Sequence, residues 1–167
     1  MSLPKPELEH VFDLAVTVSP PIDIGITPFG MRRVIPITGG TLTLSEALAL
    51  RYYPGENGAH GHVLSAGADF QLILNAGTMA NLDARYVLEM RDGSRVFVAN
   101  TALRVASVET SARLMRGDTV ESSEVYFRCQ PRFETPAPQW SWLNDHQFVG
   151  SGMRKPDGVY LSFFKVL

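Results

Sequence analysis

The sequence predicts an all-β protein, a closed antiparallel β-barrel of about eight or more strands with one or two short helices. Three observations favour this class: short segments of alternating apolar and polar residues, glycine-containing turns between them, and only two helical stretches. Closure into a barrel is favoured over an open sheet because it removes unpaired strand edges. With 167 residues, of which 45% are hydrophobic and 19% charged, we expect one folded domain over residues 1–167.

The first strand is predicted from Leu8 to Val18, where the even positions are apolar except for His10 and polar residues take many of the odd ones. Ser19-Pro20-Pro21 should end this strand, because proline donates no hydrogen bond to a sheet. A loop is expected to follow.

Further short strands are predicted by segments rich in β-branched or aromatic residues. Glycine-containing turns at 75–77, 91–93 and 156–158 separate several of them, so consecutive strands should pair antiparallel. These strands are expected at 32–37, 70–74, 82–90, 95–100, 125–133, 147–152 and 159–166.

Two short helices are predicted, at 44–52 and 108–116. Ser107 can cap the second, which carries Glu109 near its start and Arg113 and Arg116 near its end, as the helix dipole favours.

Composition excludes several function classes. Lys and Arg total 15 against 17 Asp and Glu, a net charge of -2, so no positive field favours nucleic acid. Cys129 is the only cysteine, which rules out an internal disulfide and a zinc site of several thiolates. The first ten residues do not resemble a signal peptide and no long apolar run occurs, so we expect a cytoplasmic protein that does not bind membranes.

An ordered set of short motifs resembles the domain-of-unknown-function 3237 family, also called uncharacterised protein family 0311. The resemblance covers most of the chain and implies a barrel similar in shape to allene oxide cyclase and dirigent proteins, without implying an activity. The motifs are Phe29-Gly-Met-Arg32, Pro36-Ile-Thr-Gly39-Gly40, Gly67-Ala-Asp69-Phe70, Leu82-Asp-Ala-Arg85-Tyr86, Tyr126-Phe-Arg128, Pro131-Arg-Phe133-Glu134, Trp142-Leu-Asn144 and Phe148-Val-Gly150.

A loop or helix insert is expected at about 41–66, where this chain holds roughly a dozen more residues than such proteins usually do. It would cover a cavity mouth or form a subunit contact.

Arginine and tyrosine on two predicted strands are candidates for stabilising negative charge. Arg85 would bind a carboxylate or enolate if its face points inward, as the resemblance favours, and would be a solvated charge beside Asp83 if it points outward. Tyr126 and Arg128 should share one side of their strand, where they could stabilise an oxyanion or form a structural ion pair.

Asp69 and Glu134 are the candidate general bases, because burial in a cavity raises the pKa of a carboxylate toward neutrality. Asp69 could equally hydrogen-bond turn amides. Arg32, Trp142 and Asn144 are candidate substrate-binding residues, as anion ligand, stacking wall and carbonyl donor, with core packing the alternative for Trp142.

A metal site is a weaker alternative. His60 and His62 would lie on one side of a strand, but no nearby Glu or later His motif completes a cupin-type ligand set. We therefore expect no metal and no cofactor.

The leading hypothesis is a cofactor-independent enzyme, of isomerase, cyclase or lyase type, that moves a proton on a small carbonyl or carboxylate compound in a barrel pocket. One alternative is a protein that binds a hydrophobic metabolite without chemistry. The other is a structural role in which the insert and exposed Tyr52 and Tyr53 form a homo-oligomer contact. The expected partners are thus a small ligand and further copies of the chain.

Overall fold

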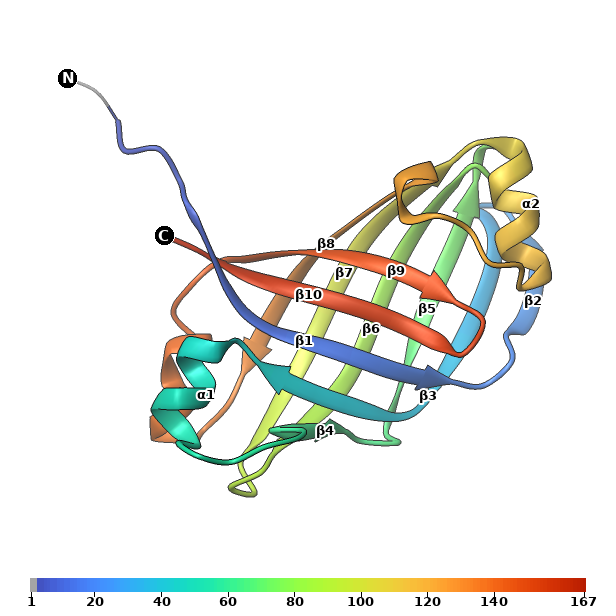
Figure 1. Ribbon diagram of the computed structural model, residues 1–167. Helices are drawn as coiled ribbons and strands as arrows, with labels where there is room; N and C mark the ends of the chain where they lie inside the picture. Colours follow the sequence, from blue (N-terminus) through green and yellow to red (C-terminus); the bar gives the residue numbers. More distant parts are fainter. Residues whose placement is uncertain (1–2) are drawn as a thin grey trace.

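The protein is a closed antiparallel β-barrel, as predicted (Figure 1). The computed structural model describes residues 3–167. In this range the strands are β1 (Leu8–Val18), β2 (Ile22–Thr27), β3 (Gly30–Leu44), β4 (Gly61–Val63), β5 (Gly67–Leu74), β6 (Met79–Met90), β7 (Arg95–Ala106), β8 (Val125–Glu134), β9 (Phe148–Lys155) and β10 (Gly158–Val166). The helices are α1 (Glu46–Tyr52), α2 (Val108–Arg116) and the 3-10 turns η1 (Asn75–Gly77), η2 (Ser122–Glu124) and η3 (Pro138–Leu143).

Strand order follows the chain around most of the barrel. The ring runs β1, β10, β9, β8, β7, β6, β5 and β3, and the pairing of β1 with β3 closes it. β4 takes over from β5 between β3 and β6 farther along those strands, and β2 pairs with β3. Hairpin connections account for the antiparallel pairing of β6 with β7 and of β9 with β10.

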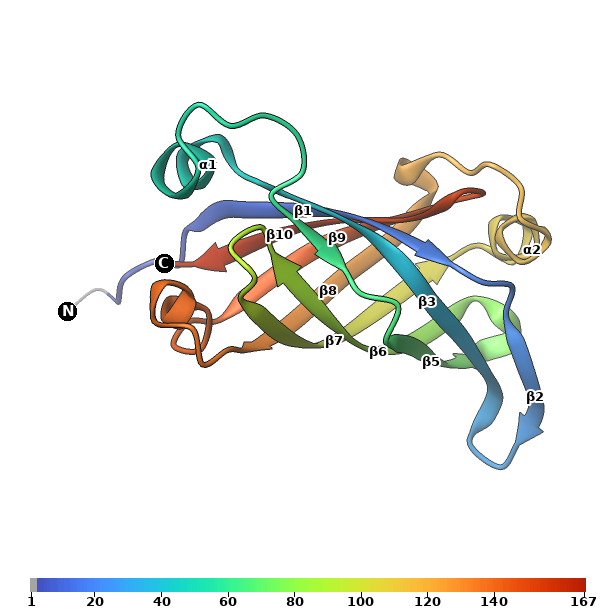
Figure 2. The ribbon, with the colours of Figure 1, turned by 90° about the horizontal axis from the view of Figure 1, so that it is seen from below.

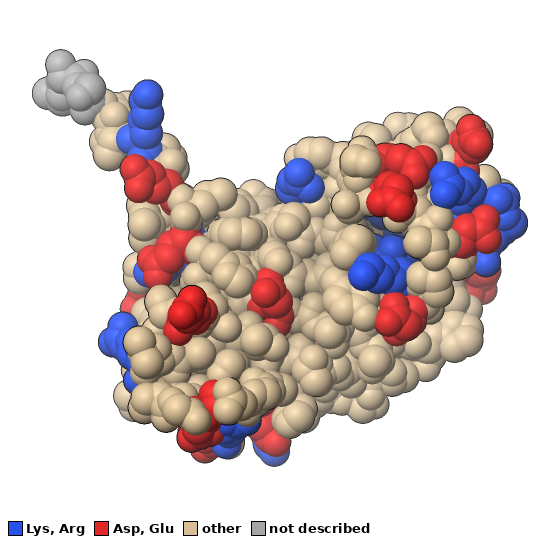
Figure 3. Space-filling model, viewed as in Figure 1, with Lys and Arg blue, Asp and Glu red and all other residues tan. Residues whose placement is uncertain are grey.

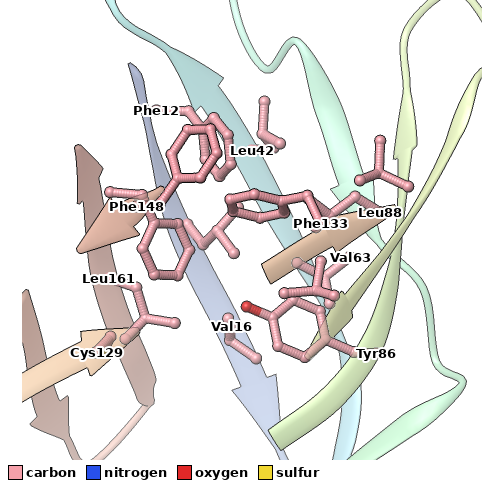
Figure 4. Packing of buried hydrophobic residues seen from close by; sticks show 14 of the residues in the cluster. Phe12, Val16, Leu42, Val63, Tyr86, Leu88, Cys129, Phe133, Phe148 and Leu161 are labelled. Carbon is pink, nitrogen blue, oxygen red and sulfur yellow. The ribbon is translucent and has the colours of Figure 1, made fainter. Parts of the chain in front are cut away.

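The half of the interior toward α1 is filled by aromatic side chains. Phe12, Phe133, Phe148 and Phe163 pack edge to face, with ring centroids 4.9 to 5.9 Å apart. Figure 4 labels the first three of these rings. The half toward α2 carries smaller inner residues such as Ala84, and a cavity is left there.

The segment 41–66, predicted as an insert, forms the end of β3, helix α1 and strand β4, and α1 lies at one end of the barrel (Figure 2). Helix α1 contacts η3 through Tyr52. The Tyr52 ring lies 4.2 Å from that of Trp140, and its hydroxyl donates a hydrogen bond to the carbonyl of Gln139. Tyr53 is buried. The prediction that Tyr53 is exposed is therefore wrong, and Tyr52 is half-buried because it packs on η3 of its own chain. A subunit contact through this segment stays a prediction.

Helix α2 has the predicted bounds and cap. The Ser107 hydroxyl accepts a hydrogen bond from the Thr110 amide at 3.0 Å. Gly117 ends the helix with a φ of +83°, a conformation that glycine adopts without strain. Arg113, in the last turn, forms an ion pair with Glu124 and so ties α2 to η2.

Strand β2 lies where a loop was predicted. Ile22, Ile24 and Ile26 do alternate with polar or small residues, but the strand forms because β3 supplies its hydrogen-bonding partner. The β2–β3 hairpin projects beyond the barrel (Figure 2). At its tip the side chains of Ile26 and Phe29 are 93% and 77% exposed.

Charged side chains gather toward the two ends of the barrel on the face that carries β1 and β10, and the middle of that face is mostly uncharged (Figure 3). Among residues 3–167, none of the helices has the length and apolar character needed to cross a membrane.

Candidate functional site

A cavity of about 70 Å³ lies inside the barrel, in the half toward α2. Its walls are mainly apolar, with side chains from β1, β3, β6, β7, β8 and β10. Polar side chains also line it, and they come from β5, β6, β7 and β9: Asp69, Gln71, Tyr86, Asn100, Arg104 and Arg154. An interior of this kind is typical of a binding site, where a few polar groups orient a ligand against apolar walls.

Strand register sets these polar groups side by side. Asp69 of β5 pairs with Ala84 of β6, which in turn pairs with Asn100 of β7. Because alternate residues of a strand share a face, Gln71, Tyr86 and Arg104 point into the barrel with them. Only the methyl group of Ala84 therefore lies between Asp69 and Asn100 on the inner face of the sheet.

Asp69 is held by two donors. Gln71 Nε2 donates to Asp69 Oδ2 at 2.7 Å, and the Asp83 backbone amide donates to Oδ1 at 3.2 Å. Desolvation nevertheless raises the pKa of Asp69, because it outweighs the opposing effects of these hydrogen bonds and of the nearby Arg104 charge. A carboxyl group in this state can exchange a proton nearer to neutral pH than an ordinary aspartate.

Tyr86 and Asn100 bring unused hydrogen-bonding atoms to the same space. Their side chains are 2% and 4% exposed, and the Tyr86 hydroxyl and Asn100 Oδ1 are buried without a partner among residues 3–167. The hydroxyl points toward the middle of the barrel (Figure 4). Burial raises the pKa of Tyr86, so it stays protonated and can donate. Burial also raises the pKa of the nearby Cys129 thiol, to about 12.

Arg104 and Arg154 line the α2 side of the cavity. Burial lowers the pKa of both guanidinium groups, and in Arg104 the positive charges of Arg154 and Arg33 lower it further, while Asp69 opposes this change. Both arginines also border a small cavity beneath the segment that joins α2 to β8.

The structure overturns the inward placement of Arg85. Its side chain is 57% exposed and forms an ion pair with Asp83 at 3.2 Å on the outer face of β6. The apolar residues of that strand, including Tyr86 and Leu88, occupy the interior because burying them is more favourable than burying two charges.

Tyr126 and Arg128 share one side of β8, as predicted, but that side faces out. The Arg128 guanidinium lies 5.1 Å from the centre of the Tyr126 ring, and both residues border an open groove of about 1000 Å³ together with Arg32. Glu134 is exposed on the same face of β8. Phe127, Cys129 and Phe133 take the inner face, so none of these polar candidates reaches the cavity that Asp69 lines.

Trp142 and Asn144 make structural contacts. Trp142 Nε1 donates to the Tyr52 hydroxyl at 3.1 Å, which joins η3 to α1. The Asn144 side chain accepts from the Thr135 amide and donates to the Thr135 carbonyl, at 2.9 and 3.0 Å. Neither lines the cavity.

The two histidines do not act together. His60 precedes β4 and is buried, with Nδ1 accepting from the Leu44 amide at 3.1 Å, whereas His62 lies in β4 and is exposed. They face opposite ways because the strand begins only after His60. Within residues 3–167 no cluster of three or more His, Cys, Asp or Glu side chains has a geometry suited to a metal ion.

Residues 6–166 match a family described as "Protein of unknown function (DUF3237)". The chain belongs to the DUF3237 family. A UPF0311 protein of Rhodopseudomonas palustris is 37% identical over 164 residues, which cover 98% of this chain and 99% of that protein. Its crystal structure, of a conserved protein of unknown function, superposes with a TM-score of 0.83 at 36% identity and covers 99% of this chain and 100% of that one.

Two further solved structures have a similar fold. A protein of unknown function from Clostridium acetobutylicum is 32% identical, with a TM-score of 0.79 and coverage of 98% of this chain and 100% of that one. A beta-barrel like protein from Acinetobacter baumannii is 32% identical, with a TM-score of 0.78 and 99% coverage of both chains.

Sequence reasoning found one polar cavity residue of this DUF3237 barrel, Asp69, and missed the others. A signal for two of them was present in β7, where Asn100 and Arg104 interrupt a face otherwise formed by Val96, Val98 and Ala102. A polar residue in the apolar register of a strand indicates an inward-facing polar group. Gln71 and Arg154 gave no such signal.

Proposed function

We propose that the barrel binds a small carbonyl compound in the cavity and catalyses proton transfer, as an isomerase, cyclase or lyase would. The observation that carries this proposal is the Asp69 carboxyl group, desolvated in a mainly apolar cavity. The cavity of about 70 Å³ is far smaller than the roughly 300–1,000 Å³ typical of pockets for drug-sized ligands, so the compound has few non-hydrogen atoms.

The proposed step uses Asp69 as the base. Its carboxylate removes a proton from the carbon beside the carbonyl, the electron pair moves to the carbonyl oxygen, and an enolate forms. The Tyr86 hydroxyl donates a hydrogen bond to that oxygen, where it stabilises the developing charge. Asp69, now a carboxylic acid, returns the proton to a carbon of the enolate. If the substrate has a double bond conjugated with the enolate, transfer to the far carbon of that dienolate gives an isomer; transfer to the original carbon gives exchange. Asp69 is regenerated in both cases.

A second function is favoured by the mainly apolar wall of the cavity: retention of a small hydrophobic metabolite without reaction. In that case Asp69 and Tyr86 would only orient the ligand.

The test is deuterium uptake from D₂O into small ketones and 2-oxo acids, followed by proton NMR. Wild type should accelerate the exchange, and Asp69→Asn should lower the rate by about 10²–10⁴-fold, the usual contribution of a general base. Glu134→Gln is the matched control, because it neutralises an exposed carboxylate of the outer face. It should exchange as wild type does.

Two outcomes would contradict the proposal. Exchange that is as fast in Asp69→Asn as in wild type removes Asp69 as the base. A ligand that binds wild type tightly while no compound of the panel exchanges favours the metabolite-binding function instead.

A further inference from the structure

Two guanidinium groups point into the same end of the barrel. Arg104 is an inner-face residue of β7 and Arg154 one of β9, and both line the central cavity. Burial lowers the pKa of both groups, and the Arg154 charge adds to this effect at Arg104. Holding two partly desolvated cations together costs free energy unless an anion compensates them.

No group of the described chain, residues 3–167, compensates them fully. Neither guanidinium takes part in an ion pair, and Arg154 Nη1 is buried without a hydrogen-bond partner in this range. Among the described residues, Asp69 is the one carboxyl group that lines the central cavity, and it is already engaged by Gln71 and the Asp83 amide.

The other charged groups nearby have partners of their own. Arg33 forms an ion pair with Asp23 at 2.6 Å. Asp157, which attracts Arg154, accepts a hydrogen bond from the Tyr160 hydroxyl at 2.8 Å. Glu121 borders the small cavity below the α2–β8 segment, but its carboxylate accepts from the Glu124 amide.

The two cavities are adjacent at this end of the barrel. The central cavity and the small one beneath the α2–β8 segment share Arg104, Phe127 and Arg154 in their walls. A ligand in the central cavity can therefore contact both arginines at one end while its other end lies beside Asp69.

We propose that Arg104 and Arg154 form a carboxylate-binding site at the α2 end of the lumen, so that the barrel takes a small oxo acid rather than a neutral ketone. A planar guanidinium group matches a carboxylate with two parallel hydrogen bonds, and two arginines on neighbouring faces of the cavity clamp it. This inference rests on the proposed function of the same cavity and names its substrate class.

The experiment compares the binding of pyruvate with that of pyruvamide, its neutral analogue, by calorimetry at constant ionic strength. Wild type should bind pyruvate at least about tenfold more tightly, because hydrogen bonds to charged groups are the stronger ones. Arg104→Met and Arg154→Met should each reduce pyruvate affinity about tenfold or more and leave pyruvamide affinity within a few fold. Arg132→Met is the matched control, since Arg132 is exposed on the outer face of β8.

Folding and chemistry are controlled separately. Circular dichroism and thermal melts show whether each variant is folded. If Arg104→Met does not fold, Arg104→Gln is used in its place. Asp69→Asn should bind pyruvate as tightly as wild type or more tightly, since it removes a negative charge from the lumen, while deuterium exchange is lost. If wild type itself selects pyruvate over pyruvamide but exchanges no compound of the panel, the proton-transfer function alone is defeated.

Equal affinity of wild type for pyruvate and pyruvamide overturns the carboxylate site. So does a loss of pyruvate affinity in Arg132→Met equal to that in folded Arg104→Met and Arg154→Met. Deuterium exchange of pyruvate that persists at the wild-type rate in both arginine variants would leave the proton-transfer function standing and defeat the oxo-acid inference.

Discussion

Filling the cavity from Ala84 should abolish ligand binding while the barrel stays folded. Ala84 lies on the inner face of β6, between Asp69 on β5 and Asn100 on β7. Replacement by leucine adds three carbon atoms to a cavity of about 70 Å³. The new side chain would occupy the space that a ligand needs beside the Asp69 carboxyl group.

The expected change in stability is small because two effects oppose each other. Three buried methylene equivalents at about 0.8 kcal/mol each add about 2.4 kcal/mol to the free energy of unfolding. Overpacking subtracts about 1–3 kcal/mol, and the lost rotamer freedom of leucine about 0.5–1 kcal/mol. The net change lies within about 2 kcal/mol, which for a chain of this size shifts Tm by less than about 8 °C.

Calorimetric titration with pyruvate and thermal unfolding by circular dichroism measure the two effects. Ala99→Leu is the matched control: it makes the same change on the outer face of β7, opposite Arg85, and should keep wild-type affinity. If Ala84→Leu is too destabilised to titrate, Ala84→Val adds less volume at the same position. Wild-type pyruvate affinity in a folded Ala84 variant would refute the assignment of the binding site to the lumen.

Three further predictions concern the interior. Asp69→Asn should melt at a higher temperature than wild type at pH 7, because the pKa of Asp69 is raised in the folded protein and its ionisation therefore lowers stability as pH rises above the ordinary value of 3.8. The difference in Tm between the two proteins should shrink as pH falls toward 3.8, and a difference that stays constant with pH would contradict ionisation of Asp69 as its cause. The Cys129 thiol, buried and with a pKa of about 12, should react with a thiol-specific disulfide reagent in denaturant and be protected in the native protein, and rapid native labelling would contradict its burial. Trp140→Ala should lower the free energy of unfolding by about 3–5 kcal/mol, because the ring is fully buried against Tyr52. Urea titration measures this change, and a loss below about 1 kcal/mol would show that this end of the barrel does not contribute to the cooperative core.

Local sequence patterns predicted most of the elements. The alternation from Leu8 to Val18 gave β1 with its observed bounds, and Ser107 and the charges of 108–116 gave α2 with its cap. Strand β2 was missed because Pro20 and Pro21 precede it and Gly25 interrupts it, so only its pairing with β3 makes it a strand.

The candidate site was predicted less well. Neighbouring residues decide which side chains share a face of a strand, but the tertiary structure decides whether that face points into the barrel. On β6 the pattern put Asp83 and Arg85 together on one side, correctly, and the apolar opposite side was itself a signal for the interior. The resemblance-based inward placement of Arg85 went against that signal and was wrong. On β8 the same reasoning applies to Tyr126 and Arg128, which lie opposite the buried Phe127 and Phe133.

The sequence by itself determined the all-β class, the antiparallel hairpins and which side chains share a strand face, because the two-residue period and the turn residues act over a few neighbours. Only the tertiary structure decided that Asp69 and Gln71 of β5 face inward while Phe70 and Leu72 face out, the reverse of the usual preference. Closure of the barrel fixes the register of β5 between β3 and β6 and thereby the direction of every side chain on it. The same closure brings Arg104 and Arg154, fifty positions apart in the sequence, to one end of the cavity.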